Sequence, residues 1–249
     1  METKYNNLFI LIPFISLMSL GLLMVTSASI YIADDIYGNP FHFASRQMFF
    51  ISIGLIVMLL FLSTPSNLLY KLDWVFMLIS ILLLLALFIP DVGTSVNGSI
   101  RWIRLGPINI QPSEICKFSL ILYISGYSVR RISEIDSLRS FLKPLFLLFI
   151  ISVLIMGQPD LGSTAIICML VVAILFYAGI SFFQFSLLSI LIGLLGVVAI
   201  SSSPMRIARM MAYMDPFDKE VVLGSGYQLS NSLISIGQGG WLGLGIGNS

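Results

Sequence analysis

Residues 161–205 read LGSTAIICMLVVAILFYAGISFFQFSLLSILIGLLGVVAISSSPM and contain no formally charged side chain. A helix that crosses a lipid bilayer needs about 20 consecutive, mostly apolar residues. At 45 residues, this stretch is long enough for two crossings, and Gly179 lies where a turn between them would fall. The stretch therefore predicts two membrane-spanning helices.

Uncharged stretches recur along the whole chain. Residues 8–33, 47–70, 74–90 and 144–159 form runs of 26, 24, 17 and 16 residues without a charge. The 249 residues are 57% hydrophobic and 10% charged, with a mean hydropathy of +0.99. Because an ordinary soluble domain carries about 25% charged residues, the composition excludes soluble enzyme folds. Transmembrane strands would show short alternating segments instead, so the spans are helical.

We predict an all-α, polytopic membrane protein that forms a single integral membrane domain over residues 1–249. The first uncharged stretch is too long for the apolar core of a signal peptide, and no small-residue cleavage site closes it, so we expect a retained span. An outward, incomplete segment is expected over residues 201–249. The predicted helices cover residues 8–32, 45–63, 73–90, 113–129, 144–157, 161–179 and 182–200.

The Lys and Arg residues of the short loops predict the orientation. Cytoplasmic loops carry an excess of these residues. Six lie on the side of the N-terminus and three on the other side, so we expect a cytoplasmic N-terminus. The six are Lys4, Lys71, Arg130, Arg131, Arg139 and Lys143, and the three are Arg46, Arg101 and Arg104.

Several classes of site are excluded by residue counts. His42 is the only histidine, so neither a histidine-based metal site nor a Ser-His-Asp triad can be built from this chain alone. Cys116 and Cys168 both fall in predicted helices, which argues against a disulfide framework. The net charge of +1 gives no reason to expect a nucleic-acid partner.

A first group of charges lies around the start of the predicted helix 113–129. Ser113 after Pro112 suits a helix start, and Glu114 and Lys117 share a helix face. Charges at membrane depth usually face a cavity or a partner. One interpretation is a polar site to which Arg101 and Arg104 bring guanidinium groups that suit phosphate oxygens. The other is an interfacial Trp-Arg anchor beside a structural Glu–Lys ion pair.

A second group is Gln158-Pro159-Asp160-Leu161-Gly162, between two predicted helices. Pro159 interrupts the first helix, and Asp160 is suited to cap the second. Capping is the interpretation that the local sequence favours. The alternative is a carboxylate that faces a cavity.

A third group contains Arg206 and Arg209, which share one face of an expected helix with Met and Ile residues elsewhere. This pattern is typical of a helix in the membrane interface. The helix is either a plain anchor or a basic lip that holds an anionic lipid headgroup.

The last segment is rich in glycine, with eight glycines between residues 224 and 247. Residues 227–236 suit a short helix between the glycine clusters. We expect a re-entrant segment, which is tolerated in a membrane only where protein or water shields the backbone. No Gly-Lys-Ser/Thr follows, so the segment is not a phosphate-binding loop.

Taken in order, these motifs resemble the SEDS family (shape, elongation, division and sporulation proteins), from about residue 20 to the last residue. The first and last motifs are more similar to the cell-division branch than to the elongation branch. The motifs are Ser27-Ala28-Ser29, Gly98 with Arg101-Trp102-Ile103, Gln111-Pro112-Ser113-Glu114 with Lys117, Gln158-Pro159-Asp160-Leu161-Gly162, Arg206 with Arg209 and Asp215-Pro216, Gly224-Ser225-Gly226-Tyr227-Gln228, and Gly247-Asn248-Ser249.

The resemblance implies a ten-helix fold and a peptidoglycan glycosyltransferase of the bacterial inner membrane, acting at the division septum. Such a protein polymerises lipid II and releases undecaprenyl diphosphate. A class B penicillin-binding protein, which is a transpeptidase, is the implied partner together with other division proteins, and a divalent cation (Mg or Mn) is a candidate cofactor. By motif position, Glu114, Lys117 and Asp160 are expected as supporting groups of a polar cavity, and Arg101, Arg104, Arg206 and Gln228 as substrate-binding groups.

The family's catalytic Asp follows its Gly-Asn-Ser motif, so it is expected beyond Ser249. We therefore expect the 249 residues by themselves to be inactive as a polymerase. Two other functions remain open at this point. One is a flippase or transporter of lipid-linked sugars, which also needs polar groups in a membrane cavity. The other is a non-catalytic division scaffold, which applies if the protein ends at Ser249.

Overall fold

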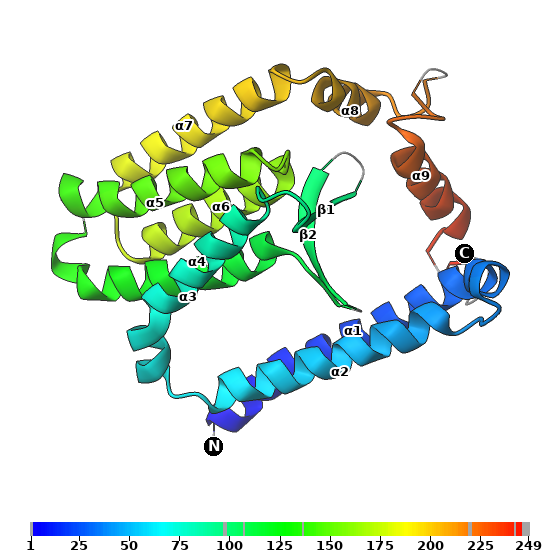
Figure 1. Ribbon diagram of the computed structural model, residues 1–249, viewed down its shortest axis with the longest axis horizontal. Helices are drawn as coiled ribbons and strands as arrows, with labels where there is room; N and C mark the ends of the chain where they lie inside the picture. Colours follow the sequence, from blue (N-terminus) through cyan, green and yellow to red (C-terminus); the bar gives the residue numbers. More distant parts are fainter. Residues whose placement is uncertain are drawn as a thin grey trace. The chain divides into compact units, whose positions relative to one another are not determined.

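The structure is a computed structural model that describes residues 2–96, 99–106, 108–135, 137–218, 221–241 and 243–245. Of the motif residues named above, Gly98 and residues 247–249 lie outside this part (Figure 1). The elements are α1 (Glu2–Tyr37), α2 (His42–Ser63), α3 (Ser66–Ala86), β1 (Gly93–Val96), β2 (Ser99–Leu105), β3 (Ile108–Ile110), α4 (Pro112–Arg130), the 3-10 turn Ile132–Glu134, α5 (Leu138–Met156), α6 (Leu161–Tyr177), α7 (Phe182–Ser201), α8 (Pro204–Met214) and α9 (Tyr227–Gly239).

Each of the seven predicted helices overlaps one of α1 to α7, but several ends were wrong. The clearest differences are α3, which begins at Ser66 rather than at 73, and α5, which begins at Leu138 rather than at 144. A charged residue ends an uncharged window but does not interrupt backbone hydrogen bonding, so the helices continue past the windows. Pro144 lies inside α5. The short helix expected at residues 227–236 is present as α9.

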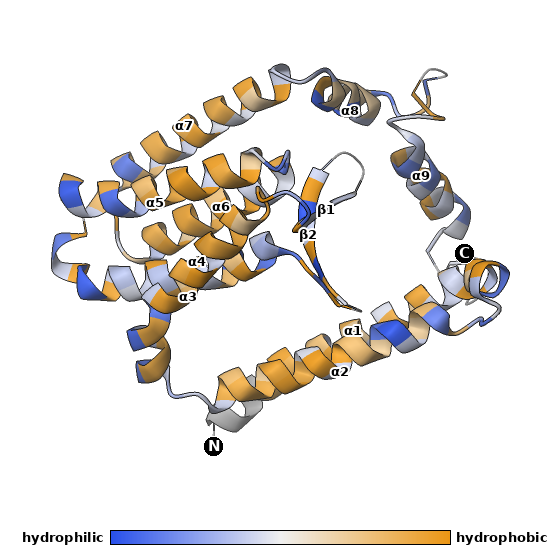
Figure 2. Cartoon of the chain, in the orientation of Figure 1, coloured by the Kyte–Doolittle hydropathy of each residue, from blue (hydrophilic) through white to orange (hydrophobic). Residues whose placement is uncertain are grey.

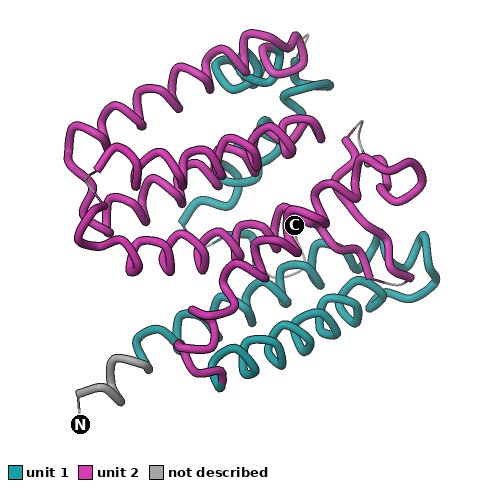
Figure 3. Tube along the Cα trace, turned by 60° about the vertical axis from the view of Figure 1, so that its left-hand side comes forward, with its two compact units in different colours: residues 1–63, 208–249 teal, residues 64–207 magenta. Residues whose placement is uncertain are grey.

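The chain divides into two compact units, residues 1–63 with 208–249 and residues 64–207 (Figure 3). In the first unit, α1 and α2 pack against each other as a helical hairpin. Gly38 takes a positive φ of 62° at the turn, a conformation that glycine adopts without strain. The rings of Tyr37 and His42 stack there at 4.0 Å between centroids. That the whole chain forms a single integral membrane domain stays a prediction.

In the second unit, α3, α4, α5 and α6 pack around one apolar core (Figure 1). The sheet connects the C-terminal end of α3 to the N-terminal end of α4, and a short corner connects α5 to α6. Core side chains come from all four helices and are fully buried. They include Leu84, Leu120, Ile124, Ile151, Ile155, Ile167, Val171 and Leu175.

The segment between α3 and α4, which we expected to be a loop, contains a three-stranded antiparallel sheet in the order β1-β2-β3. The pairing of β1 with β2 is irregular, because Thr94 lies opposite Trp102 whereas Ser95 lies opposite Ile100. Arg101 is therefore the extra residue of a β-bulge. A bulge bends its strand and changes the direction of a side chain.

Polar side chains begin three of the helices. Asp160 caps α6 by accepting from the backbone N–H of Ser163, and Ser137 caps α5 in the same way. Ser181 and Gln184 form a capping box at the start of α7. The helix predicted to begin at residue 113 begins one residue earlier: Gln111 is the N-cap and Pro112 the first helical residue. Proline suits that position because its missing N–H would have no helical partner.

The long helices consist mostly of hydrophobic residues, drawn in orange in Figure 2, which confirms the prediction of a polytopic, mainly helical membrane protein. Within the described ranges, five helices are long and apolar enough to cross a membrane: α1, α2, α3, α5 and α7. The apolar helix α6 has only 17 residues. The number of seven spans and the re-entrant position of the last segment stay predictions.

Candidate functional site

The corner between α5 and α6 is held by contacts from two distant segments. The side-chain Nε2 of Gln158 donates to the carbonyl oxygen of Leu84, near the end of α3, at 3.3 Å. Arg101 of β2 donates from Nη2 to the carbonyl oxygen of Pro159 at 2.6 Å. The corner is therefore tied both to α3 and to the sheet.

Asp160, the last residue of the corner, is only 5% exposed. Its Oδ1 accepts from the backbone N–H of Ser163 at 3.1 Å, and its Oδ2 accepts from the Ser163 hydroxyl at 2.7 Å. The Nε atom of Arg101 lies 3.7 Å from Oδ2, which makes an ion pair but is too long for a hydrogen bond. The capping interpretation is therefore confirmed, and the same carboxylate also faces a cation.

Arg101 lies at the bulge of β2, and one third of its side chain is exposed. Its Nε atom is buried and has no hydrogen-bond partner within the described residues. Arg104, three residues further along β2, is exposed and lies opposite Asn109 of β3. Of the two arginines that we expected at one site, the structure ties Arg101 to the corner.

Glu114 and Lys117 form an ion pair in the first two turns of α4, with 2.7 Å between Nζ and Oε1. The Glu114 side chain is 56% exposed, whereas that of Lys117 is 19% exposed. The prediction that Glu114 and Lys117 form an ion pair is confirmed. The neighbouring hydroxyl of Ser113 is buried, with no hydrogen-bond partner in the described part of the chain.

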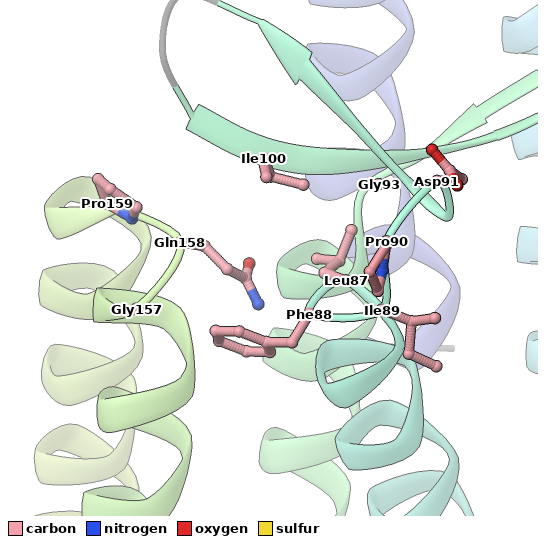
Figure 4. Close-up of a pocket in the computed structure, with 10 residues that line it drawn as sticks. All are labelled: Leu87, Phe88, Ile89, Pro90, Asp91, Gly93, Ile100, Gly157, Gln158 and Pro159. Atoms are coloured by element: carbon pink, nitrogen blue, oxygen red, sulfur yellow. The ribbon is translucent and has the colours of Figure 1, made fainter.

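A cavity of about 400 Å³ lies between the end of α3, the sheet and the α5–α6 corner. In Figure 4 the Gln158 side chain reaches from the corner toward Leu87 and Phe88, and Ile100 lies on the strand above it. The cavity is lined by Leu87, Phe88, Ile89, Pro90, Asp91, Gly93, Ile100, Gly157, Gln158 and Pro159. Its size lies within the range of about 300 to 1,000 Å³ that is usual for ligand sites.

The polar groups of the site therefore gather at one end of the α3–α6 bundle. The helices α4 and α6 both begin at this end, and their N-termini carry partial positive charge. Arg101 and Lys117 add positive charge at this end, and each of them is paired with a carboxylate, Asp160 and Glu114 respectively.

Two further predicted site residues lie on α8 and α9. Arg206 donates from Nη1 to the carbonyl oxygen of Ala199 at 2.7 Å, which joins α8 to the end of α7. Gln228 is an exposed residue of α9 in the other compact unit. In the described residues no three His, Cys, Asp or Glu side chains gather as metal ligands, and a divalent cation stays a prediction.

One buried ion pair was not predicted from the sequence. Asp73 of α3 is 1% exposed, and its Oδ2 lies 2.7 Å from Nη1 of Arg130, near the end of α4. A Cβ atom at Gly126 would collide with the same carboxylate, so the glycine makes room for the pair. Arg130 also lies over the ring of Tyr70, 5.1 Å from its centroid. A carboxylate inside an apolar helix was the available signal.

Comparison with curated proteins gives close matches over almost the whole chain. The chain is 41% identical over 235 residues to a probable peptidoglycan glycosyltransferase FtsW of Legionella pneumophila, covering 94% of this chain and 59% of that protein. It is 41% identical over 243 residues to the protein of the same name from Coxiella burnetii, covering 97% and 64%. The chain thus spans about three fifths of the length of these relatives. Their names agree with the predicted resemblance to the division branch.

Comparison with solved structures shows the same fold. A chain of a peptidoglycan synthase complex, described as coordinating polymerization and crosslinking, matches with a TM-score of 0.65 and 24% identity, over 89% of this chain and 63% of that chain. The rod shape determining protein RodA of Thermus thermophilus matches with a TM-score of 0.52 and 20% identity, over 92% and 86%.

The decisive comparison is with protein families. The model of the FtsW, RodA and SpoVE family, described as cell cycle proteins, matches residues 7–249. The match covers the bundle, the sheet with Arg101 and the corner with Asp160. The chain therefore belongs to the FtsW/RodA/SpoVE family of cell cycle proteins.

Proposed function

We propose that the full-length protein is a peptidoglycan glycosyltransferase that polymerises lipid II. A sugar hydroxyl of one lipid II molecule attacks the anomeric carbon of the growing glycan, the bond from that carbon to the diphosphate breaks, and undecaprenyl diphosphate leaves. The names of the curated relatives support this reaction. The observation in the structure that carries it is Arg101, a partly exposed guanidinium beside an apolar cavity.

The chemistry asks for positive charge where the diphosphate leaves. Guanidinium groups bind phosphate oxygens through paired, charge-assisted hydrogen bonds. Positioned donors of this kind stabilise the charge that develops on a leaving group. Arg101 is held by Pro159 and Asp160, and it is the first candidate for this role.

The remaining polar groups have supporting roles in the proposal. Glu114 holds the ammonium group of Lys117 near the start of α4. The partial positive charge of the helix N-terminus adds to the charge of this ammonium group. Asp160 orients Arg101. Arg104, Arg206 and Gln228 are proposed to contact the lipid-linked substrate, and we assign none of these residues the role of base. A Mg or Mn ion held largely by the diphosphate itself is compatible with this arrangement.

We further propose that the protein acts in the inner membrane at the division septum, with its N-terminus in the cytoplasm. A class B penicillin-binding protein is the proposed partner, because it would crosslink the glycan strands that the polymerase makes. The solved complex that coordinates polymerization and crosslinking supports this pairing.

Reconstitution tests the function directly. The purified full-length protein and its partner are placed in liposomes with fluorescent lipid II, and the products are separated by size. The proposal predicts glycan strands many disaccharides long. Transfer of the lipid II headgroup across the bilayer without polymer would instead identify a flippase, and no change in lipid II would leave only a scaffold.

A further inference from the structure

Methionine is concentrated in α8, the short helix that follows α7 (Figure 1). Four of the 12 methionines of the chain lie there within ten residues, namely Met205, Met210, Met211 and Met214. Their side chains are exposed by 47 to 72%. The sulfur of a methionine side chain is a soft, polarizable thioether. The proposed glycosyl transfer uses none of these four side chains.

Three of the four methionines share one face of α8, which we call the methionine face: Met210, Met211 and Met214. A helix turns by about 100° per residue, so Met214 and Met211 lie about 40° and 100° from Met210 around the helix axis. Met214 follows Met210 by four residues and Met211 by three, at which spacings Cβ atoms are about 5 to 6 Å apart. Because each side chain has three rotatable bonds, the three sulfur atoms can converge on one ligand atom beside Met214.

The methionine face points away from the buried side of α8. Ala212, the buried residue of the helix, lies about 150° around the axis from the middle of the methionine face. Arg209 lies about as far away in the other direction. Arg206 lies at the flank of the face, and its Nη1 donates to the carbonyl oxygen of Ala199. The guanidinium closest to the methionines around the axis is therefore held at the end of α7.

The place of the methionine face along α8 favours a cation. Met214 is the last residue of the helix, and the carboxyl end of a helix carries partial negative charge. Asp215 follows directly, and its backbone N–H donates to the carbonyl oxygen of Met211 at 3.0 Å. A hard cation such as Mg²⁺ prefers oxygen ligands, whereas thioether sulfur selects Cu(I).

We infer that the methionine face binds one Cu(I) ion through the sulfur atoms of Met210, Met211 and Met214, with Met214 between the other two. The step is the binding of an ion, without electron transfer, and it goes beyond the proposed function. The other use of this face is insertion of the same side chains into the lipid of a membrane interface. The two uses differ in what the sulfur atoms contact.

Nuclear magnetic resonance of the methionine methyl groups tests the inference without relying on activity. The full-length protein, isotope-labelled at these methyl groups, is titrated in detergent with silver nitrate, because Ag(I) is a soft, redox-stable substitute for Cu(I). We expect the methyl resonances of Met210, Met211 and Met214 to shift together and to saturate together. The resonance of Met205, about 170° away around the axis, should stay in place. Equal shifts of all four resonances, or no shift of the first three, would overturn the inference.

A matched pair of variants in the same helix adds a second measurement. Met214→Leu keeps an apolar side chain of similar size but removes the central sulfur, so we expect half-saturation of the Met210 and Met211 resonances at a roughly tenfold higher Ag(I) concentration. Met205→Leu removes an equally exposed thioether outside the face and should leave the titration unchanged. Half-saturation at the same concentration in both variants would contradict the site.

The titration is repeated in dioleoyl phosphatidylglycerol nanodiscs that contain a spin-labelled stearate. If Ag(I) still shifts the three methyl resonances there, the inference stands. If the spin label broadens them and Ag(I) leaves them in place, the face is a membrane anchor and the metal site is wrong. Neither result depends on polymerisation of lipid II, so the proposed function stands or fails separately.

Discussion

At the scale of single residues, the ion pair of Asp73 and Arg130 is buried on the side of its carboxylate. The carboxylate is almost fully buried, whereas the guanidinium is 36% exposed and lies over Tyr70. Removing one partner of a buried pair leaves an uncompensated charge, which costs more than the pair itself contributes. Arg130 should therefore matter for stability. It lies 16 residues, or about 24 Å along α4, from Glu114 at the candidate site, so its effect on stability is separate from the chemistry of the site.

We predict that Arg130→Ala lowers the free energy of unfolding by about 3 kcal/mol, since the partial exposure of Arg130 limits the loss to the lower end of the usual range. The measurement is thermal unfolding of the full-length protein in detergent. Arg131→Ala is the matched control, because Arg131 pairs with Glu134 at the surface and both side chains are exposed. It should change the stability by less than about 1 kcal/mol. Equal melting temperatures of the two variants would refute a stabilising role of the buried pair.

Gly126 provides an independent test of the same pair. We expect Gly126→Ala to destabilise the protein, although alanine is the better helix former by about 1 kcal/mol, because the added methyl group collides with the Asp73 carboxylate. Gly54→Ala, in the middle of α2, should be neutral or stabilising, because an added Cβ atom there has no neighbour within 4 Å outside its own helix backbone. A stabilising effect of Gly126→Ala would show that α3 and α4 do not approach as described.

At the scale of elements, the start of α6 combines two roles in one carboxylate. Asp160 caps the helix and faces Arg101. Asparagine caps helices about as well as aspartate but carries no charge. The two roles can therefore be separated by substitution.

We predict that Asp160→Asn keeps most of the thermal stability but lowers polymerisation, because Arg101 loses the charge that orients it. Asp160→Ala should lose both, with a stability cost of about 1 kcal/mol for the cap. Ser181→Ala removes the cap of α7 away from the site and should affect stability alone. If Asp160→Asn polymerises lipid II like the wild type, the carboxylate acts only as a cap.

The elements also show what the sequence could and could not predict. Long uncharged windows predicted the helices that overlap α1, α2, α3, α5, α6 and α7, because the length of an apolar run and the span of a helix are set by the same bilayer. The helix that overlaps α4 contains Glu114 and Lys117 and lies in no such window. The short strands carry β-branched residues such as Ile100, Ile103 and Ile108. Because they are only 4, 7 and 3 residues long and lie among Gly, Asn and Pro, the sequence predicted a loop instead. The bulge at Arg101 depends on how β1 pairs with β2, which no local pattern encodes.

At the scale of the whole molecule, the site is assembled from segments that are far apart in the sequence. Arg101 and Pro159 are 58 residues apart, and Leu84 and Gln158 are 74 apart. The motif Gln158-Pro159-Asp160 of the corner was recognisable in the sequence. Only the packing of α3, α5 and the sheet brings this motif to Leu84 and Arg101. The capping of α6 by Asp160 was predictable because it depends on neighbours in sequence. The partner of Arg101 was not.

The role of Arg101 at the leaving diphosphate is tested by the rate at which full-length Arg101→Gln polymerises lipid II. We predict a kcat/KM roughly a hundredfold below that of the wild type, the usual cost of removing one group that stabilises a developing charge. Arg139→Gln, at an exposed position near the start of α5, should retain the wild-type value. If Arg101→Gln and Arg139→Gln polymerise lipid II equally fast and their stabilities are equal, Arg101 does not bind the leaving diphosphate.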